Sequence, residues 1–264
     1  MSVFDPRAYW ENRLEKAYGP HGVGYLGLGR HYNDWLYKVR RVVFLRRMRA
    51  LGRDFREAAI LDIGSGTGFY IERWLELGAR KIVGIDLTEV AVGNLRGRYP
   101  DLRFHRLDIT GDLQALGREP FDFVSAFDVL FHVVEDAAYE RAIGQVAALL
   151  KPGGLFVWSD NYLHGPTQRG VHHVSRSLAE IESILSASRL RVVERRPMFY
   201  LMNAPVDTES RFLKTFWARL TGLVERGELA GTAIGGLLYP LELALTRFAR
   251  EGPGTEMMIC EKVG

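Results

Sequence analysis

One aspartate and three glycines occupy every second position in the segment of this 264-residue chain whose spacing best suits the binding of a small ligand. The segment reads Asp62-Ile-Gly64-Ser-Gly66-Thr-Gly68 and separates a short apolar run from a helical pattern. Glycines at such a junction allow a tight turn and let a ligand approach the main chain. The helix that follows presents free N–H groups and the positive end of its dipole. A nucleotide or an amino-acid carboxylate can dock there.

The spacing of these glycines argues against a dinucleotide. The G-x-G-x-x-G fingerprint of pyrophosphate binding would need a glycine at position 69, where the chain has Phe69. The pattern is instead D-x-G-x-G-x-G, with Asp62 ahead of the first glycine. A carboxylate at that place does nothing for a pyrophosphate but favours a ligand that carries an ammonium group.

Two further acids stand where apolar runs end. Asp86 closes the second run, where a carboxylate can accept hydrogen bonds from both ribose hydroxyls. Asp108 closes the third run, where an acid can accept from an adenine amino group. Leu87 and Ile109 follow these acids and can enclose the adenine between them.

The elements that must position these residues alternate between strand and helix. Short apolar runs of strand length occupy 59–63, 81–85, 102–107, 121–127, 155–159, 190–194 and 255–262. Helical patterns occupy 5–18, 33–51, 69–77, 88–98 and 136–150, and a capping box at 177–180 opens another helix. Residues 151–154 are expected to form a turn. This alternation predicts an α/β fold with a parallel sheet that is covered on both faces.

The core pattern is flanked and interrupted by helical segments. Residues 1–56 are expected to form an N-terminal helical cap, and 57–197 with 255–264 the core. Residues 198–254 are mostly helical in pattern and stand before the last strand. We expect them to be a helical insertion that acts as a lid.

Five segments, in this order, resemble class I S-adenosylmethionine-dependent methyltransferases over about residues 59–195. They are ILDIGSGTG, GIDLT, RLDI, FDFVSAFDVLFHV and LLKPGGLFV. The resemblance implies a Rossmann-like fold with a seven-stranded, mostly parallel sheet and helices on both faces. It implies S-adenosyl-L-methionine as cofactor and S-adenosyl-L-homocysteine as product.

The resemblance also implies roles for individual residues. The acid that matches Asp62 lies near the amino group of the methionine part, and the residues that match Gly64, Gly66 and Gly68 run beside the cofactor. The position that matches Phe127 lines the methionine arm. These roles agree with those that the spacing independently indicates for Asp86 and Asp108.

Methyl transfer from a sulfonium is an in-line displacement, and a hydroxyl acceptor benefits from a base such as histidine. His132 is the candidate base, because it follows the fourth strand run, and His173 is the alternative. A histidine that only packs or hydrogen-bonds in a loop is an equal alternative for His132. Residues expected to face the substrate are Tyr25, His31, Asp160, Asn161, His164 and His172.

The pair Asp160-Asn161 raises the question of a metal. Cation-dependent catechol-type O-methyltransferases carry a similar pair, and its oxygens would suit Mg2+. Those enzymes need a further acid at the end of the fourth strand, where this chain has Phe127 followed by Asp128. We therefore expect no metal and assign Asp160 and Asn161 to the substrate pocket.

Composition limits the class of protein and its partners. Apolar residues make up 47% and charged residues 25%, and the net charge of +3 is too small to indicate nucleic acid as a partner. The N-terminus has no signal-peptide pattern, and Ala230 to Leu245 is broken by Pro240 and Glu242 and too short to span a membrane. We expect a cytoplasmic protein, with a homodimer contact as one use of the insertion's apolar residues.

The lead hypothesis is an enzyme that methylates a small organic molecule, with oxygen favoured as the acceptor. Methylation at nitrogen or carbon is the alternative. An RNA or protein methyltransferase is a further reading, motivated by the basic face between Lys38 and Arg56. A binding module that keeps the fold without catalysis is the third.

Overall fold

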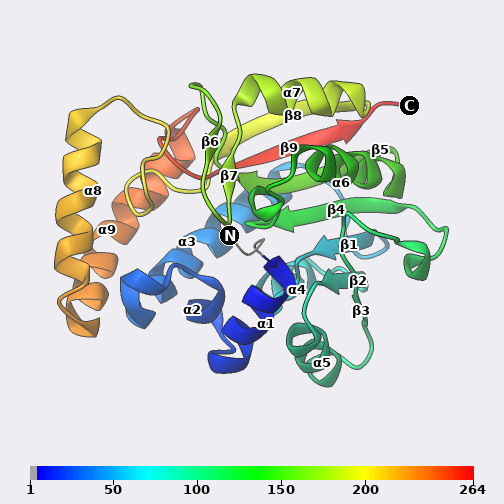
Figure 1. The fold of residues 1–264 in the computed structure, drawn as a ribbon, viewed down its shortest axis with the longest axis horizontal. Coiled ribbons are helices and arrows are strands. Elements are labelled where there is room, and N and C mark those ends of the chain that lie inside the picture. The colour runs from blue at the N-terminus through cyan, green and yellow to red at the C-terminus, as the bar shows by residue number, and fades with distance from the viewer. Residues whose placement is uncertain (1–4) are drawn as a thin grey trace.

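The computed structural model describes residues 5–264, and its centre is a seven-stranded sheet (Figure 1). The strand order is β3-β2-β1-β4-β5-β9-β8. The bounds are β1 Ala59–Ile63, β2 Lys81–Asp86, β3 Arg103–Arg106, β4 Phe121–Phe127, β5 Leu150–Asp160, β8 Leu190–Pro197 and β9 Glu256–Lys262. A separate two-stranded ribbon pairs β6 (Gln168–Arg169) with β7 (Val174–Ser175).

The sheet is parallel except at one strand. β1 to β5 pair in parallel, while β9 runs antiparallel between β5 and β8. The chain moves outward from β1 to β2 and β3 and then returns to place β4 on the other side of β1. Such a reversal of strand order leaves a crevice at the carboxyl ends of the strands, where open α/β sheets bind ligands. The predicted fold is confirmed.

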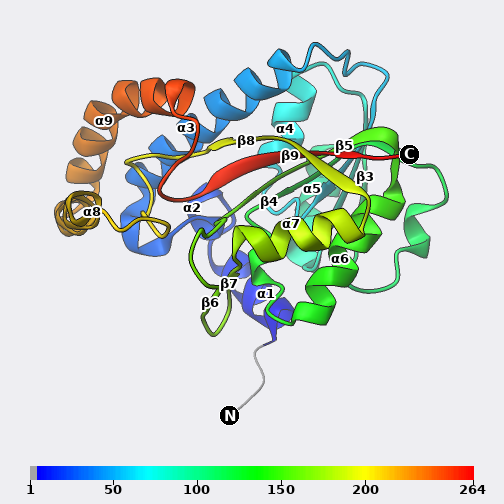
Figure 2. The same cartoon turned by 90° about the horizontal axis from the view of Figure 1, so that it is seen from above.

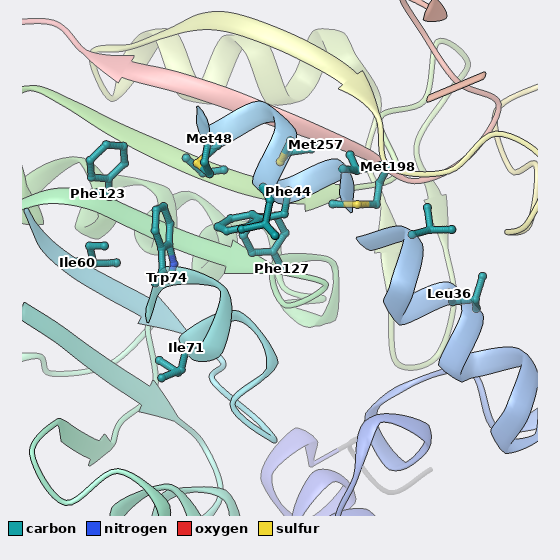
Figure 3. Packing of buried hydrophobic residues seen from close by; sticks show 14 of the residues in the cluster. Leu36, Phe44, Met48, Ile60, Ile71, Trp74, Phe123, Phe127, Met198 and Met257 are labelled. Carbon is teal, nitrogen blue, oxygen red and sulfur yellow. The ribbon is translucent and has the colours of Figure 1, made fainter. Parts of the chain in front are cut away.

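Helices cover both faces of the sheet, as Figure 2 shows from above. One apolar cluster joins the sheet to α3, α4 and α5, and the other joins it to α6 and α7. Figure 3 shows the first cluster, in which Phe44 and Met48 of α3 face Trp74 of α4 and Phe127 of β4. The bounds are α3 Gly29–Ala50, α4 Phe69–Glu76, α5 Glu89–Arg98, α6 Asp136–Leu149 and α7 Leu178–Ala187.

Further helices precede this core in the chain or stand between β8 and β9. They are α1 Pro6–Lys16, α2 Pro20–Val23, α8 Arg211–Val224 and α9 Glu228–Phe248, with single 3-10 turns η1 Leu26–Leu28, η2 Gln114–Leu116 and η3 Leu130–His132. The helices α8 and α9 stand between β8 and the last strand, β9. The first four residues of the predicted cap lie outside the described residues.

The expected turn at 151–154 is wrong. These residues belong to β5, which begins at Leu150 and is longer than the predicted 155–159. Leu150 pairs with Phe121, and a shift of register between Phe121 and Phe123 absorbs the additional residues. Gly153 adopts a φ of +73°, so the glycines serve an irregular strand rather than a separate turn.

The expectation that Pro240 and Glu242 break the apolar stretch is also wrong. The helix α9 runs for 21 residues through both positions. Among residues 5–264 it is the one helix that is long and apolar enough, by length and composition alone, to cross a membrane. Glu242 is fully buried, and its carboxylate accepts hydrogen bonds from the N–H groups of Tyr200 (2.6 Å) and Leu201 (2.8 Å). One face of α9 is therefore fixed to the rest of the protein.

Candidate active site

A cleft of about 360 Å³ lies at the carboxyl ends of β1 to β4. Eight of the residues that the sequence singled out line it, namely Gly64, Gly66, Asp86, Leu87, Asp108, Ile109, Phe127 and His132. A second hollow lies at the amino ends of β1 to β4, among Arg80, Lys81 and Asp101, and contains none of the predicted site residues. The chemistry-bearing groups therefore meet in the cleft at the carboxyl ends.

The glycines of the first loop serve two purposes. Gly64 (φ +68°) and Gly66 (φ +50°) line the cleft, and a side chain at Gly64 would come within 2.3 Å of Val129. Gly68 (φ +82°) does not line the cleft, and a Cβ there would meet Leu95 of α5 at 2.7 Å. Gly68 is thus required for the turn into α4 and its packing on α5, and its place beside the cofactor stays a prediction.

Asp86 links the end of β2 to the glycine loop. Its Oδ1 accepts hydrogen bonds from the N–H (2.9 Å) and hydroxyl (2.7 Å) of Thr88, and its Oδ2 accepts from the N–H of Gly66 (2.8 Å). Burial raises the pKa of this carboxyl, although these hydrogen bonds act in the opposite direction. The carboxylate is fixed in orientation, and its Oδ2, which accepts one hydrogen bond, can accept another from a ligand hydroxyl.

Asp108 also lines the cleft, and local hydrogen bonds fix its carboxylate as they fix that of Asp86. Its Oδ1 accepts from the N–H and the hydroxyl of Thr110, each at 2.8 Å. Ile109 beside it is buried, and its carbonyl oxygen accepts a hydrogen bond from Gln145 of α6 at 2.6 Å. With Leu87 on the other side, the cleft offers apolar side chains next to a fixed acid, as a purine ring requires.

Asp62 lies behind the loop rather than on the wall of the cleft. It is 2% exposed, and its Oδ1 accepts a 2.6 Å hydrogen bond from the hydroxyl of Ser125 on β4. Burial raises its pKa to about 7 against the opposing effect of that hydrogen bond. A direct contact of Asp62 with a ligand ammonium group stays a prediction, because Asp62 is not among the residues that line the cleft.

Aromatic rings and one ion pair form the far end of the cleft. Phe127 stacks on Tyr70, with ring centroids 3.8 Å apart, and both line the cleft. Arg40 of α3 reaches Asp128, with 2.5 Å between Nη1 and Oδ2. Asp128 has a φ of +58°, a strained value for a residue other than glycine, and exchanges two 2.9 Å hydrogen bonds with Ser159. Sequence reasoning missed Arg40 and Tyr70, which come from helices outside the motifs.

His132 is held in one orientation at this end. Its Nδ1 lies 2.8 Å from the carbonyl oxygen of His172. A carbonyl only accepts, so Nδ1 carries the proton and Nε2 keeps its lone pair. Burial lowers the pKa of His132 to about 4, so the ring is neutral at pH 7. A neutral imidazole with a free Nε2 can accept a hydrogen bond or a proton.

The N-terminal helices cover the cleft, but through residues other than those predicted. Trp10 and Leu14 of α1 and Val23 of α2 line it. The hydroxyl of Tyr18 donates to the carbonyl oxygen of Gly66 (3.2 Å). Trp10 and Leu14 stand one helical turn apart, and this spacing was the signal in the sequence that could have identified them.

Tyr25 and His31, which were predicted to face the substrate, are not among the residues that line the cleft. The side chain of Tyr25 is 62% exposed. His31 is bound to α9, where its Nδ1 lies 2.9 Å from the hydroxyl of Thr232 and its N–H donates to the carboxylate of Glu228. The helix that binds His31 is α9, which belongs to the insertion. No local sequence pattern links this helix with residue 31.

The residues after β5 have partners of their own. The ring of His164 lies 2.6 Å from the carboxylate of Asp207, outside the cleft. Asn161 donates to Ser175 (3.2 Å) and accepts from Thr255 (3.0 Å). These contacts fix the segment rather than open a substrate pocket there.

Asp160, His172 and His173 also lie off the cleft wall. Asp160 is 1% exposed, and burial raises its pKa to about 8. His172 adjoins the site, because its ring stacks on that of His132 at 6.2 Å between centroids. His173 packs against His172 and so lies one residue further from the cleft. Within residues 5–264, no group of three or more His, Cys, Asp or Glu side chains is arranged to hold a metal ion.

The chain is similar to known methyltransferases in sequence and in fold. Residues 60–154 match a family model described as a methyltransferase domain. A probable S-adenosylmethionine-dependent methyltransferase from Mycolicibacterium smegmatis is 31% identical over 131 residues, which cover 48% of this chain and 45% of that protein. A tRNA U34 carboxymethyltransferase from Pseudoalteromonas translucida is 26% identical over 199 residues, covering 71% and 60%. The matched part of the chain thus spans less than two thirds of these relatives.

Solved structures extend the likeness to nearly the whole fold. Magnesium protoporphyrin IX methyltransferase from Synechocystis, crystallised with S-adenosylmethionine, has a TM-score of 0.60 at 12% identity, covering 99% of each chain. A didemethyltoxoflavin N1-methyltransferase from Burkholderia thailandensis, crystallised with S-adenosylhomocysteine, has a TM-score of 0.55 at 18% identity, covering 100% of this chain and 93% of that one.

Proposed function

We propose, from the premise that this chain belongs to the class I S-adenosylmethionine-dependent methyltransferases, that it methylates an oxygen atom of a small organic molecule beside His132. The observation that carries the proposal is the fixed, neutral imidazole of His132 in the same cleft as Gly64, Asp86 and Asp108. Methyl transfer to a hydroxyl requires the electrophilic methyl group and a base on either side of the same acceptor oxygen, and one cleft that holds both groups can provide this.

The residues of the cleft fit the cofactor of this family. The positive φ angles of Gly64 and Gly66 bring main chain to the cleft wall, Asp86 presents an oriented carboxylate, and Leu87 and Ile109 offer apolar surface to a purine. When bound, S-adenosylmethionine supplies an electrophilic methyl group on a sulfonium. The rings of Tyr70 and Phe127 favour a cation at that end of the cleft.

His132 acts on the proton of the acceptor. Its Nε2 would accept the hydrogen bond of the acceptor hydroxyl and take its proton as the oxygen displaces the sulfonium sulfur from the methyl carbon, so that the carbon–sulfur bond breaks while the carbon–oxygen bond forms. A hydroxyl that gains a methyl group becomes a strong acid, so a base with a pKa of about 4 is sufficient. Trp10, Leu14 and Val23 exclude water from the cleft.

An RNA substrate receives less support from the structure. Four of the arginines of α3 that motivated it are engaged within the protein, Arg40 with Asp128, Arg41 with Glu76, Arg46 with Thr246 and Arg47 with Glu194, whereas Arg49 is exposed. Phosphate binding needs free cations, because its affinity comes from neutralising phosphates and releasing counterions. These four side chains would have to leave their partners first.

The test begins with a screen of hydroxylated and amine compounds for a cofactor-dependent mass gain of one methyl group. With an acceptor in hand, His132→Gln and His132→Ala are expected to lower kcat by roughly 10²- to 10⁴-fold while cofactor affinity, measured by calorimetry, is retained. In the wild type, kcat should stay level from about pH 6 to about pH 8, since His132 is neutral throughout that range.

His173→Ala is the matched variant, because His173 lies nearby but off the cleft. It should leave kcat within about twofold of the wild type, a change of less than 1 kcal/mol in the barrier. Full activity of both His132 variants, or methylation of amines alone, would contradict the proposal for oxygen.

A further inference from the structure

The helices α8 and α9 form an arm at one end of the molecule, away from the edge of the sheet that carries β3 (Figures 1 and 2). α9 packs on α3 along one face, and α8 packs on α9. The inner face of α9 is closely fitted, since a Cβ at Gly235 would come within 2.2 Å of the Trp35 ring. The outer face of α9 has no such neighbour among the described residues.

That outer face is apolar along the whole helix. Leu229 is 85% exposed, Leu237 79% and Phe248 78%. Exposed Ala233, Pro240 and Ala244 lie between them on the same side of the helix, as a period of 3.6 residues requires. Large side chains so exposed along one helix face form a continuous patch, which monomeric proteins usually avoid.

No charge interrupts the patch. Between Glu228 and Arg247 the one charged residue of α9 is Glu242, which is fully buried on the inner face. The most apolar 18-residue window of α9 has a mean hydropathy of 1.3, with only 22% of it buried. The neighbouring α8 adds Phe212, which is 73% exposed, and Leu223, which is 43% exposed.

The rim of the patch is basic. Exposed cations of residues 211–250 are Arg211, Lys214, Arg219, Arg226, Arg247 and Arg250. Two exposed acids belong to the same segment, Glu225 and Glu228, and the carboxylate of Glu228 accepts from the N–H groups of Arg30 and His31. Just outside it, Glu209 pairs with Lys214 and Glu251 with Arg195. Five arginines therefore remain around the apolar side chains.

We propose that this outer face of α8 and α9 docks onto a membrane surface that carries anionic lipid headgroups. Apolar side chains on one face of a helix with cations at its rim suit the boundary between acyl chains and phosphates. A dimer through the same face would bring the arginines of two copies together, which like charges oppose. Insertion of α9 across the membrane would expose the buried Glu242 and break its bonds to Tyr200 and Leu201.

The test is co-flotation of the full chain with vesicles. We expect partition onto vesicles that contain phosphatidylglycerol, weaker partition onto pure phosphatidylcholine, and a loss of binding as salt is raised. The double variant Leu237→Gln/Phe248→Gln should partition at least roughly 100-fold more weakly, because both side chains lose the gain of leaving water. Arg247→Gln/Arg250→Gln should weaken partition onto the anionic vesicles roughly 30-fold.

Matched variants separate the effect of the patch from the general effect of losing an exposed apolar side chain or two positive charges. Val193→Gln changes an exposed apolar residue on β8, and Arg118→Gln/Arg141→Gln removes the same charge elsewhere. Both should partition like the wild type, and all variants should keep cofactor binding, which shows that they fold. The proposal is overturned if the wild type does not float with anionic vesicles or if the patch variants float equally well. It is also overturned if the protein is a dimer that Leu237→Gln/Phe248→Gln dissociates.

Discussion

At the scale of single residues, the acids at the strand ends differ in the environment that surrounds them. Asp86 accepts three hydrogen bonds, whereas Asp160 accepts one, from the N–H of Asn161 at 2.7 Å. Burial dominates at Asp160 and raises its pKa to about 8. The Asp160 carboxyl is therefore mostly protonated at neutral pH, unlike a carboxylate that holds a cation.

This difference predicts a pH dependence of stability. Asp160 has a pKa near 3.8 when unfolded and about 8 when folded, so the folded protein binds more protons between these values. The contribution of Asp160 to the free energy of unfolding is therefore greatest below about pH 4, and it is lost as the pH rises through about 8. Asp160→Asn cannot ionise and should be more stable than the wild type at pH 9 by on the order of 3 kcal/mol.

Urea unfolding of both proteins at about pH 5 and about pH 9 measures the effect. Asp101→Asn, at an exposed position, should unfold like the wild type at both values. An equal difference between Asp160→Asn and the wild type at the two pH values would show that Asp160 does not titrate in this range.

The sequence located the residues of the cleft better than it located their neighbours. Gly64, Asp86 and Asp108 follow from spacing, because a strand end fixes where the next side chain points. The partners of His31 and His164 did not follow, because Glu228 and Asp207 come from the insertion, remote in sequence. Spacing along the chain carries no information about which distant segment folds over a residue.

At the scale of elements, α1 is fixed over the cleft by a contact that also completes another helix. The carboxylate of Glu11 accepts from the N–H groups of Glu89 (2.9 Å) and Val90 (2.8 Å), at the first turn of α5. An anion at a helix N-terminus satisfies free donors and meets the positive end of the dipole. The same helix carries Trp10 and Leu14 into the cleft wall.

Glu11→Ala should therefore have two effects at once. Loss of the two hydrogen bonds should lower the free energy of unfolding by about 1 kcal/mol, the usual cost of removing a cap. It should also weaken cofactor binding by roughly threefold to tenfold, because ordering the loosened α1 then opposes binding. Urea unfolding and calorimetry measure the two quantities. Glu15→Ala, on the exposed side of α1, should change neither, and a stability loss without an affinity loss would separate α1 from the cleft.

The alternation of strands and helices was predictable, while the elements that depart from it were not. Apolar runs such as 59–63 and 121–127 agree with β1 and β4 residue by residue, because buried parallel strands leave little choice of composition. Lys151-Pro-Gly-Gly154 has the composition of a turn yet lies within β5, because the residues on either side of it, Leu150 and Leu155, pair with β4 and the four residues form the irregularity between them. Pro240 likewise has the composition of a helix end yet lies inside the helix α9.

At the scale of the whole molecule, the residues that line the cleft come from segments that lie far apart in the sequence. The glycine loop, Asp86 and His132 lie at or just after the carboxyl ends of β1, β2 and β4, whereas Trp10 and Leu14 come from a helix that precedes the sheet in the chain. A ligand that bridges them binds the folded state alone. Its binding must therefore stabilise the whole chain, by about 2.7 kcal/mol at about 100 times Kd.

S-adenosylmethionine at that concentration should raise Tm by about 5 to 10 °C, since a domain of this size shifts by about 2–4 °C per kcal/mol. Asp86→Asn should shrink the rise, because a neutral amide is a weaker acceptor for ribose hydroxyls and weakens binding roughly 10- to 100-fold. NAD should give no rise, since Phe69 stands where the pyrophosphate fingerprint needs glycine. A rise with NAD and none with S-adenosylmethionine would contradict the assignment of the cleft, which rests on a glycine spacing that does not match the dinucleotide fingerprint.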